Sequence, residues 1–224
     1  MVMNVRKTDE FSQIEYLLEC HLEGIESFAD KMESLIVNEA KQAKDVYQKR
    51  IEAEKENDFY SDILYNDLLN SINLYPQLIR KLIVQGLFSL IDNFLRRLAE
   101  QQFNNHGGIP SYINTSGNGI SKARKFLVKS AKIDLTAVEN EWKRIKKAQN
   151  VRDYLVHKES HSPKKKGEVI KICQAHENLD FDENNSEVII SSSEYIYETV
   201  KDVKVFCLKV LEELRNKSCV KPIH

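Results

Sequence analysis

The sequence predicts a mainly helical, all-α protein. Only 7 Gly and 4 Pro occur among 224 residues, so the chain is poor in the residues that make tight turns. Hydrophobic residues make up 42% of the composition, which is enough for a packed core. They recur three or four residues apart over long stretches, the spacing that places side chains on one face of a helix.

The first predicted element is a long amphipathic helix, or a helical hairpin, over residues 9–55. This segment has no Pro and one Gly, and Thr8 is its candidate N-cap. The apolar pattern fades after Leu35, so a coiled coil along the whole segment is not expected. The recurring residues are Phe11, Ile14, Leu18, Ile25, Phe28, Met32 and Leu35, with His21 on the same seam. Residues 1–58 are predicted to form an acidic helical arm.

Two further helices are predicted over residues 59–74 and 77–103. The first should end at Tyr75, because a residue that precedes proline, here Pro76, avoids the helical region. The second carries a wide apolar face and is the predicted central core helix. That face consists of Leu78, Leu82, Leu87, Leu90, Ile91, Phe94, Leu95 and Leu98.

The rest of the chain is predicted to be helical, with one small β-hairpin. In chain order we expect a loop at 104–119, helices at 120–131 and 134–156, a basic loop at 158–167, strands at 169–173 and 188–191, and a final helix from Ser193 to about Asn216. The main domain is thus predicted over residues 59–217, and residues 218–224 form a C-terminal tail.

Charge is distributed unevenly along the chain, although the formal net charge is only −1. Residues 9–58 hold 14 acidic and 6 basic residues, a local charge of −8. Residues 122–166 hold 14 basic and 5 acidic residues, a local charge of +9. Either the two segments attract each other, or the basic one faces a polyanion, or both are solvated helix faces.

Cysteine spacing and hydropathy argue against a zinc protein and against a membrane-spanning protein. Cys20, Cys173, Cys207 and Cys219 include no CxxC pair, and the histidines near them form no zinc pattern, so we expect reduced thiols and no metal. The glycines form no phosphate-binding loop, so no nucleotide cofactor is expected. No stretch approaches the roughly 20 apolar residues that span a bilayer, and no signal-peptide core is present. The prediction is a cytoplasmic protein without a membrane partner.

The residues with the clearest chemical potential lie in the segment NVRDYLVHK, residues 150–158. Arg152 and His157 are separated by four residues, and Asp153 follows the arginine. On an ideal helix the arginine and the histidine lie about 140° apart, whereas Asp153 and His157 share a face. A single helix therefore makes a poor Arg–His site.

This segment resembles the R-x4–6-H motif of HEPN domains, in which the residue after the arginine is often Asn, Asp or His. The resemblance covers about residues 72–217. Within it, residues 77–100 are similar to the family's first core helix, and residues 168–214 look like a common family ending. It implies a HEPN-like up-down helical bundle. It also implies a homodimer in which the motif helices of two protomers form one composite active site.

The resemblance implies a metal-independent endoribonuclease, as in toxin–antitoxin and phage-defence systems, with an antitoxin or other regulatory protein as a partner. The 2′-OH of RNA is the nucleophile. His157 would take its proton, or protonate the leaving 5′ oxygen, because histidine titrates near neutral pH. Arg152 would hold the phosphate, and Asp153 would orient His157. The expected products carry 2′,3′-cyclic phosphates.

Basic residues flank the motif and are predicted to bind RNA phosphates with salt-sensitive, sequence-independent affinity. They are Lys143, Arg144, Lys146, Lys147, Lys158, Lys164, Lys165 and Lys166. Trp142 and Tyr154 could stack on a base, but the core is the favoured place for both aromatic rings.

Other interpretations stay open. Arg152 could simply pair with Asp153 or Glu159 at a surface. The chain could be a catalytically inactive HEPN module that binds RNA or a protein. It could also be an interaction protein whose 1–58 arm docks a partner helix, or an enzyme whose arm shields the basic cleft. One group of these toxins carries a tyrosine that a nucleotidyltransferase modifies, but the matching position here is Glu159, so that partner is not expected.

Overall fold

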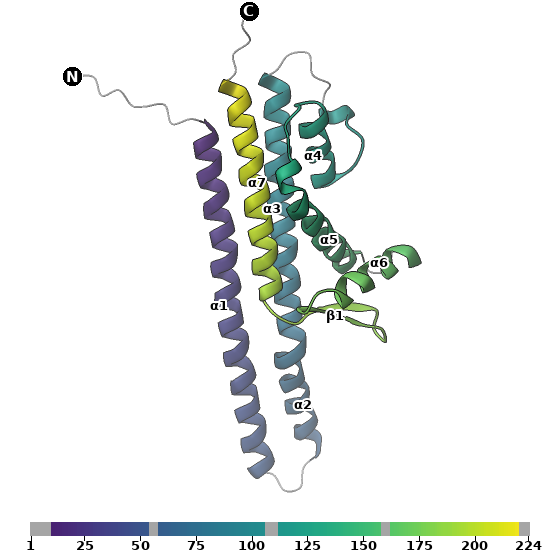
Figure 1. The fold of residues 1–224 in the computed structure, drawn as a ribbon. Helices are drawn as coiled ribbons and strands as arrows, with labels where there is room; N and C mark the ends of the chain where they lie inside the picture. The colour runs from purple at the N-terminus through teal and green to yellow at the C-terminus, as the bar shows by residue number, and fades with distance from the viewer. Residues whose placement is uncertain (1–9, 54–57, 106–111, 158–161, 220–224) are drawn as a thin grey trace, which may run out of the picture. The chain divides into compact units, whose positions relative to one another are not determined.

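The computed structural model describes residues 10–53, 58–105, 112–157 and 162–219 (Figure 1). These residues are mostly helical and include one two-stranded hairpin, which confirms the predicted all-α class. Among them, no helix has both the length and the apolar character that a membrane span requires. The predicted N-cap Thr8 and residues 220–224 of the predicted tail lie outside the described residues.

The chain divides into two compact units. Unit 1 comprises residues 1–24, 86–149 and 199–224, and unit 2 comprises residues 25–85 and 150–198. Each unit contributes buried apolar side chains, such as Phe126 and Phe206 in unit 1 and Val188 and Ile190 in unit 2.

Helix α1 (Glu10–Ala53) is one continuous helix, so the hairpin alternative is wrong. Phe11 and Leu18 of the predicted seam are buried as predicted, but from His21 onward every second position of the seam is displaced by one residue. His21, Phe28 and Leu35 are exposed, and the residues that follow each of them, Leu22, Ala29 and Ile36, are buried instead. Both sets recur every seven residues on neighbouring stripes of the helix, so periodicity alone did not distinguish them.

The predicted helix end before Pro76 is also wrong. Helix α2 (Asp58–Leu69) continues through a short π-helix, η1 (Asn70–Leu74), into α3 (Tyr75–Asn105). Proline lacks an N–H group, and its ring crowds the carbonyl four residues earlier. In the wider π turn, the Tyr75 N–H donates to the Asn70 carbonyl, five residues back, and the chain stays helical through the proline.

The predicted core face of α3 is correct only in part. Leu87, Ile91, Leu95 and Leu98 are buried, and Leu90 and Phe94 are half-buried. The prediction is wrong for Leu78 and Leu82, which are exposed, whereas Ile83 and Val84 are buried.

Two 3-10 turns and three more helices lie in the part of the chain that follows α3. The 3-10 turns η2 (Tyr112–Asn114) and η3 (Thr136–Val138) lie inside the predicted loop and at the predicted start of the 134–156 helix. Helices α4 (Gly119–Lys129), α5 (Glu139–Val156) and α7 (Glu194–Cys219) confirm the predicted helices. In unit 1, Trp142 of α5 packs on Phe206 of α7, with ring centroids 5.2 Å apart.

The segment after the motif differs most from the prediction. Residues expected to form a loop and the first strand instead form helix α6 (Pro163–Gln174). The hairpin pairs β1 (Leu179–Asp182) with β2 (Glu187–Ile190) in antiparallel register, so only the second predicted strand is confirmed. Short apolar runs do not distinguish strand from helix. Here Ser162 caps α6 and Pro163 occupies its first turn, which together start a helix.

Candidate functional site

The motif lies at the C-terminal end of α5, as predicted. Arg152 and Asp153 are half-buried on its last turns. His157 directly follows the last helical residue, Val156, and is exposed, and its backbone N–H donates to the Asp153 carbonyl at 3.0 Å. The backbone of His157 is therefore held one helical turn beyond Asp153, and its side chain is exposed.

Arg152 forms an ion pair with Asp153. Its Nη1 donates to Asp153 Oδ1 at 2.8 Å. Its Nε is buried, and none of the described residues provides it with a hydrogen-bond partner. The carboxylate of Asp153, the residue predicted to orient His157, binds the neighbouring guanidinium. This ion pair holds the Arg152 side chain in place. It also occupies Nη1, one of the guanidinium nitrogens that could otherwise bind an anion.

A small pocket of about 50 Å³ lies between the end of α5 and the first half of α6. It brings Asp153 and Lys165 together, two residues that sequence reasoning had placed in the same site. Its other lining residues are Asn150, Tyr154, Glu168 and Val169. A water molecule occupies about 30 Å³ in the liquid, so the pocket has room for about one water and none for a nucleotide.

The N-terminus of α6 is strongly basic. The Ser162 Oγ accepts from the Lys165 N–H at 3.4 Å, and Lys164 and Lys165 are exposed in the first turn. A helix N-terminus carries a partial positive charge and unpaired N–H groups, so these lysines add to a field that already favours anions. Lys166 differs from them: its Nζ donates to Ser186 Oγ at 2.7 Å and lies 5.6 Å from the centre of the Phe181 ring.

Tyr154 anchors the motif helix to the hairpin. Its hydroxyl donates to the Ser186 carbonyl at 3.1 Å, and its ring lies 5.8 Å from that of Phe181. Burial raises the pKa of this phenol. Tyr154 is thus a core residue, the alternative that the sequence had favoured over base stacking.

Four predicted RNA-binding residues, at positions 143, 144, 146 and 147, belong to unit 1. Arg144 donates to both carboxylate oxygens of Asp202, at 2.7 and 2.6 Å, and to Glu141 at 3.1 Å. The bond to Asp202 raises the pKa of this guanidinium. Lys143 and Lys147 are exposed. Arg144 is therefore paired within unit 1 although its side chain is 53% exposed, whereas Lys143 and Lys147 are exposed and belong to no ion pair described above.

Lys146 and Lys158 complete the predicted basic set. The Lys146 Nζ donates to Ser121 Oγ at 2.8 Å and to Gln149 Oε1 at 2.5 Å, so it also binds within unit 1. Lys158 lies outside the described residues.

The acidic residues of α1 form ion pairs inside each unit. In unit 1, Glu15 pairs with Arg215 at 2.7 Å and Glu19 with Lys204 at 3.1 Å. In unit 2, the Arg80 Nε lies 2.6 Å from Glu33 Oε1. These partners lie on α7 and α3, outside the predicted basic set around the motif. They show that part of the acidic charge stabilises helix packing.

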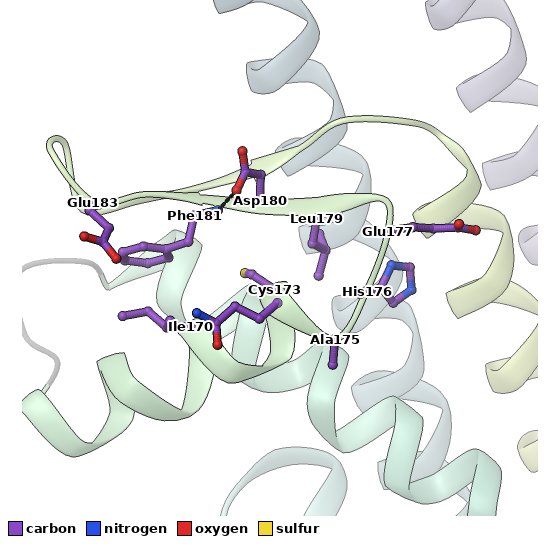
Figure 2. Close-up of a pocket in the computed structure, with 10 residues that line it drawn as sticks. Ile170, Cys173, Ala175, His176, Glu177, Leu179, Asp180, Phe181 and Glu183 are labelled. Carbon is purple, nitrogen blue, oxygen red and sulfur yellow. Dashed lines mark hydrogen bonds between the residues drawn. The ribbon is translucent and has the colours of Figure 1, made fainter.

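A larger pocket, of about 700 Å³, lies between α6 and β1 in unit 2 (Figure 2). No sequence pattern indicated this pocket, because the α6 segment was assigned to a loop and a strand. Cys173 and Leu179 point into it, and burial raises the pKa of the Cys173 thiol to about 11. The described residues that line it include Glu177, Asp180 and Glu183 but no lysine or arginine, so it is unsuited to RNA phosphates.

His176, at one side of this pocket, is held in one tautomer. Its Nδ1 accepts from the Asn178 N–H at 3.2 Å, so the proton is on Nε2, which lies 2.9 Å from Glu198 Oε2. Its ring also stands edge-on to that of Tyr195, with centroids 5.1 Å apart. Because both ring nitrogens are engaged, His176 has a structural role at the base of α7.

Within the described residues, no group of three or more His, Cys, Asp and Glu side chains is placed to hold a metal ion. No protein-family model, no curated protein and no solved structure matches the chain.

Proposed function

We propose that this chain is a metal-independent endoribonuclease of the HEPN type. The observation that carries the proposal is the arrangement at the end of α5, where an exposed His157 follows a half-buried Arg152 held by Asp153. The basic first turn of α6, with exposed Lys164 and Lys165, supports it, because a helix N-terminus with added lysines favours phosphate.

The reaction uses the nucleophile that RNA itself provides. The 2′ oxygen attacks the adjacent phosphorus, the bond from phosphorus to the 5′ oxygen breaks, and a 2′,3′-cyclic phosphate and a 5′-hydroxyl result. A neutral His157 accepts the 2′-OH proton, and a protonated histidine donates one to the departing 5′ oxygen. Arg152 stabilises the charge that develops on the phosphate oxygens.

A second copy of the motif completes this site. Arg152 and His157 are five positions apart at the end of one helix and do not share a face, so one protomer does not direct both side chains at one phosphate. When the ends of two α5 helices meet, His157 of one protomer can act as the base and the partner's His157 as the acid. The proposed enzyme is therefore a homodimer with one composite site.

The test is incubation of the purified full chain with total RNA and EDTA, followed by end-group analysis of the fragments. We expect 2′,3′-cyclic phosphate ends from the wild type and none from His157→Ala. His21→Ala is the matched control, since His21 is also an exposed histidine, on α1, and this variant should cleave like the wild type. Full activity of His157→Ala would reject the proposal.

The second candidate is a HEPN-like module that binds RNA without cleaving it. The Arg152–Asp153 ion pair favours it, because the carboxylate occupies part of the guanidinium that a phosphate would need. This candidate predicts salt-dependent RNA retention, no products, and no change in either result with His157→Ala. The third candidate, a docking arm, is less well supported, because Leu18, Leu22 and Ala29 of α1 are buried.

A further inference from the structure

An apolar stripe is exposed where η1 passes into α3 in unit 2. Leu74, Leu78 and Leu82 follow one another at four-residue intervals, and 47%, 47% and 63% of their surfaces are exposed. Tyr75, next to Leu74, is 47% exposed as well. We call these four residues the leucine stripe. On a helix they cover a face about 100° wide, the width of an apolar face that normally packs on a neighbour.

The leucine stripe is a second apolar face of this helix segment. Pro76, Ile83 and Val84 are buried and provide the first face, which packs inside the protein. An amphipathic surface helix needs one apolar face and exposes polar residues on the other. A stripe of large apolar residues left in contact with water marks a binding surface.

The chemistry of the stripe is neutral. The sequence from Leu68 to Ile79 contains no charged residue. The two basic residues that follow are paired within unit 2: Arg80 binds Glu33, and the Lys81 Nζ lies 4.0 Å from Glu187. The stripe therefore offers no charge to an acidic or basic partner, and no unpaired lysines for an anionic membrane surface.

We propose that the leucine stripe is a surface on which two copies of this chain pair. A neutral apolar stripe is complementary to itself, and a twofold axis brings identical patches together without like-charge repulsion. With the axis near Leu78, the Leu74 of each copy meets the Leu82 of the other. Rows of side chains at four-residue spacing interdigitate at a crossing angle of about −50°. This pairing goes beyond the proposed nuclease and does not depend on it.

To test this, the mass of the full chain in solution is measured by analytical ultracentrifugation over a range of concentrations. We expect self-association, and at least a tenfold rise in the dissociation constant of the stripe contact for Leu78→Glu and for Leu82→Glu, because each places uncompensated carboxylates in an apolar contact. Because the proposed nuclease also pairs through the ends of α5, assemblies larger than a dimer are expected where both contacts form, and these two variants should reduce them to that dimer. Val37→Glu is the matched control: Val37 is an exposed apolar residue on α1, and this variant should dimerise like the wild type. Circular dichroism of all variants should be unchanged, because the replaced side chains are exposed.

A photo-crosslinking amino acid at position 78 locates the contact. The expected adduct joins position 78 to residues 74–82 of a second copy, and the same amino acid at position 37 should give none. A chain that is monomeric throughout, or a dimer unaffected by Leu78→Glu and Leu82→Glu, would overturn the proposal. So would a monomer that floats with phosphatidylcholine vesicles and loses this with Leu78→Glu, which would assign the stripe to a lipid surface instead.

Discussion

The side-chain amide of Gln77 pairs with the backbone of Ile190 as a neighbouring strand would. The Ile190 N–H donates to Gln77 Oε1 at 2.9 Å, and Gln77 Nε2 donates to the Ile190 carbonyl at 3.0 Å. Arg80 Nη1 donates to the same carbonyl at 2.9 Å and to that of Ser191 at 3.0 Å. Two side chains of α3 thus close the outer edge of β2 and keep it from pairing with another strand.

Gln77→Ala should lower the free energy of unfolding by about 1–3 kcal/mol, because the part-buried Ile190 N–H loses its partner. Gln77→Glu should also lower it, because the carboxylate still accepts from this N–H but its second oxygen replaces the Nε2 donor and faces the Ile190 carbonyl, which then keeps only the bond from Arg80. The measurement is urea unfolding followed by circular dichroism. Gln174→Ala, at an exposed position on α6, is the control, and an equal loss there would show that the Gln77 pairing contributes nothing.

The basic residues should separate into two groups when tested with RNA. Lys164→Gln and Lys165→Gln should weaken binding of single-stranded RNA, and each should reduce the slope of log affinity against log salt by about 0.7. Arg144→Gln should leave that slope unchanged and lower stability instead, because Arg144 binds Asp202. Fluorescence anisotropy at several salt concentrations, with urea unfolding alongside, measures both effects.

Of the two results, that for Arg144→Gln is the more decisive. It removes the same charge as Lys164→Gln, so a purely long-range charge effect would change the two slopes alike. Equal slopes for the two variants would therefore contradict the assignment of Arg144 to the packing of unit 1.

The region after the motif shows what the sequence could and could not predict. Helix α6 was predicted as a loop and a strand because its apolar run, Val169 to Cys173, is too short to show a period. The signal that was present is the Ser162–Pro163 pair, an N-cap followed by a proline, which favours a helix start. The β2 strand was predicted correctly, because its segment is rich in β-branched residues.

The other differences between the predicted and the observed structure arise from tertiary packing. The exposed and buried stripes of α1 are neighbours with the same seven-residue period, and only contacts with other helices choose between them. Pro76 was predicted to end a helix by a local rule, and the π turn of η1 accommodates it instead. Leu78 and Leu82 were predicted as core on size and spacing, which do not reveal whether a partner covers that face.

The position of the motif was predictable, but its contacts were not. The helix predicted over residues 134–156 correctly placed Arg152 and His157 at a helix end. Local charge did not show that Arg144 binds a residue 58 positions away, or that Lys166 binds the hairpin. Such pairs depend on how distant segments pack, which a single sequence does not encode in any short pattern.

The described cysteines should differ strongly in reactivity toward a thiol reagent. Cys20 is exposed, whereas Cys173 and Cys207 are buried and burial raises the pKa of both thiols. Since the thiolate is the reactive form, native protein at pH 8 should label quickly at Cys20 and slowly at the two buried thiols. Mass spectrometry of peptides after a short pulse of iodoacetamide measures this. Rapid labelling of Cys207 would show that the core of unit 1 opens readily.

The same thiols should make the protein less stable at alkaline pH. Burial raises the pKa of Cys173 from an ordinary value near 9 to about 11. Between these values the unfolded chain has lost the thiol proton and the folded chain still holds it, so rising pH favours the unfolded state. The contribution of this group is complete below about pH 9 and is lost toward pH 11. One proton of difference corresponds to a slope of up to about 1.4 kcal/mol per pH unit.

Cys173→Ala isolates that contribution. The variant should lose stability at every pH because it leaves a small cavity, but its loss between pH 9 and 11 should be shallower than that of the wild type. Cys20→Ala is the matched control, and it should keep the wild-type slope because Cys20 is exposed. Urea unfolding at intervals of half a pH unit measures the slopes.

Because burial also raises the pKa of Cys207 and Tyr195, some slope should remain in Cys173→Ala. An unchanged slope in Cys173→Ala would mean that the Cys173 thiol ionises as readily in the folded chain as in the unfolded one.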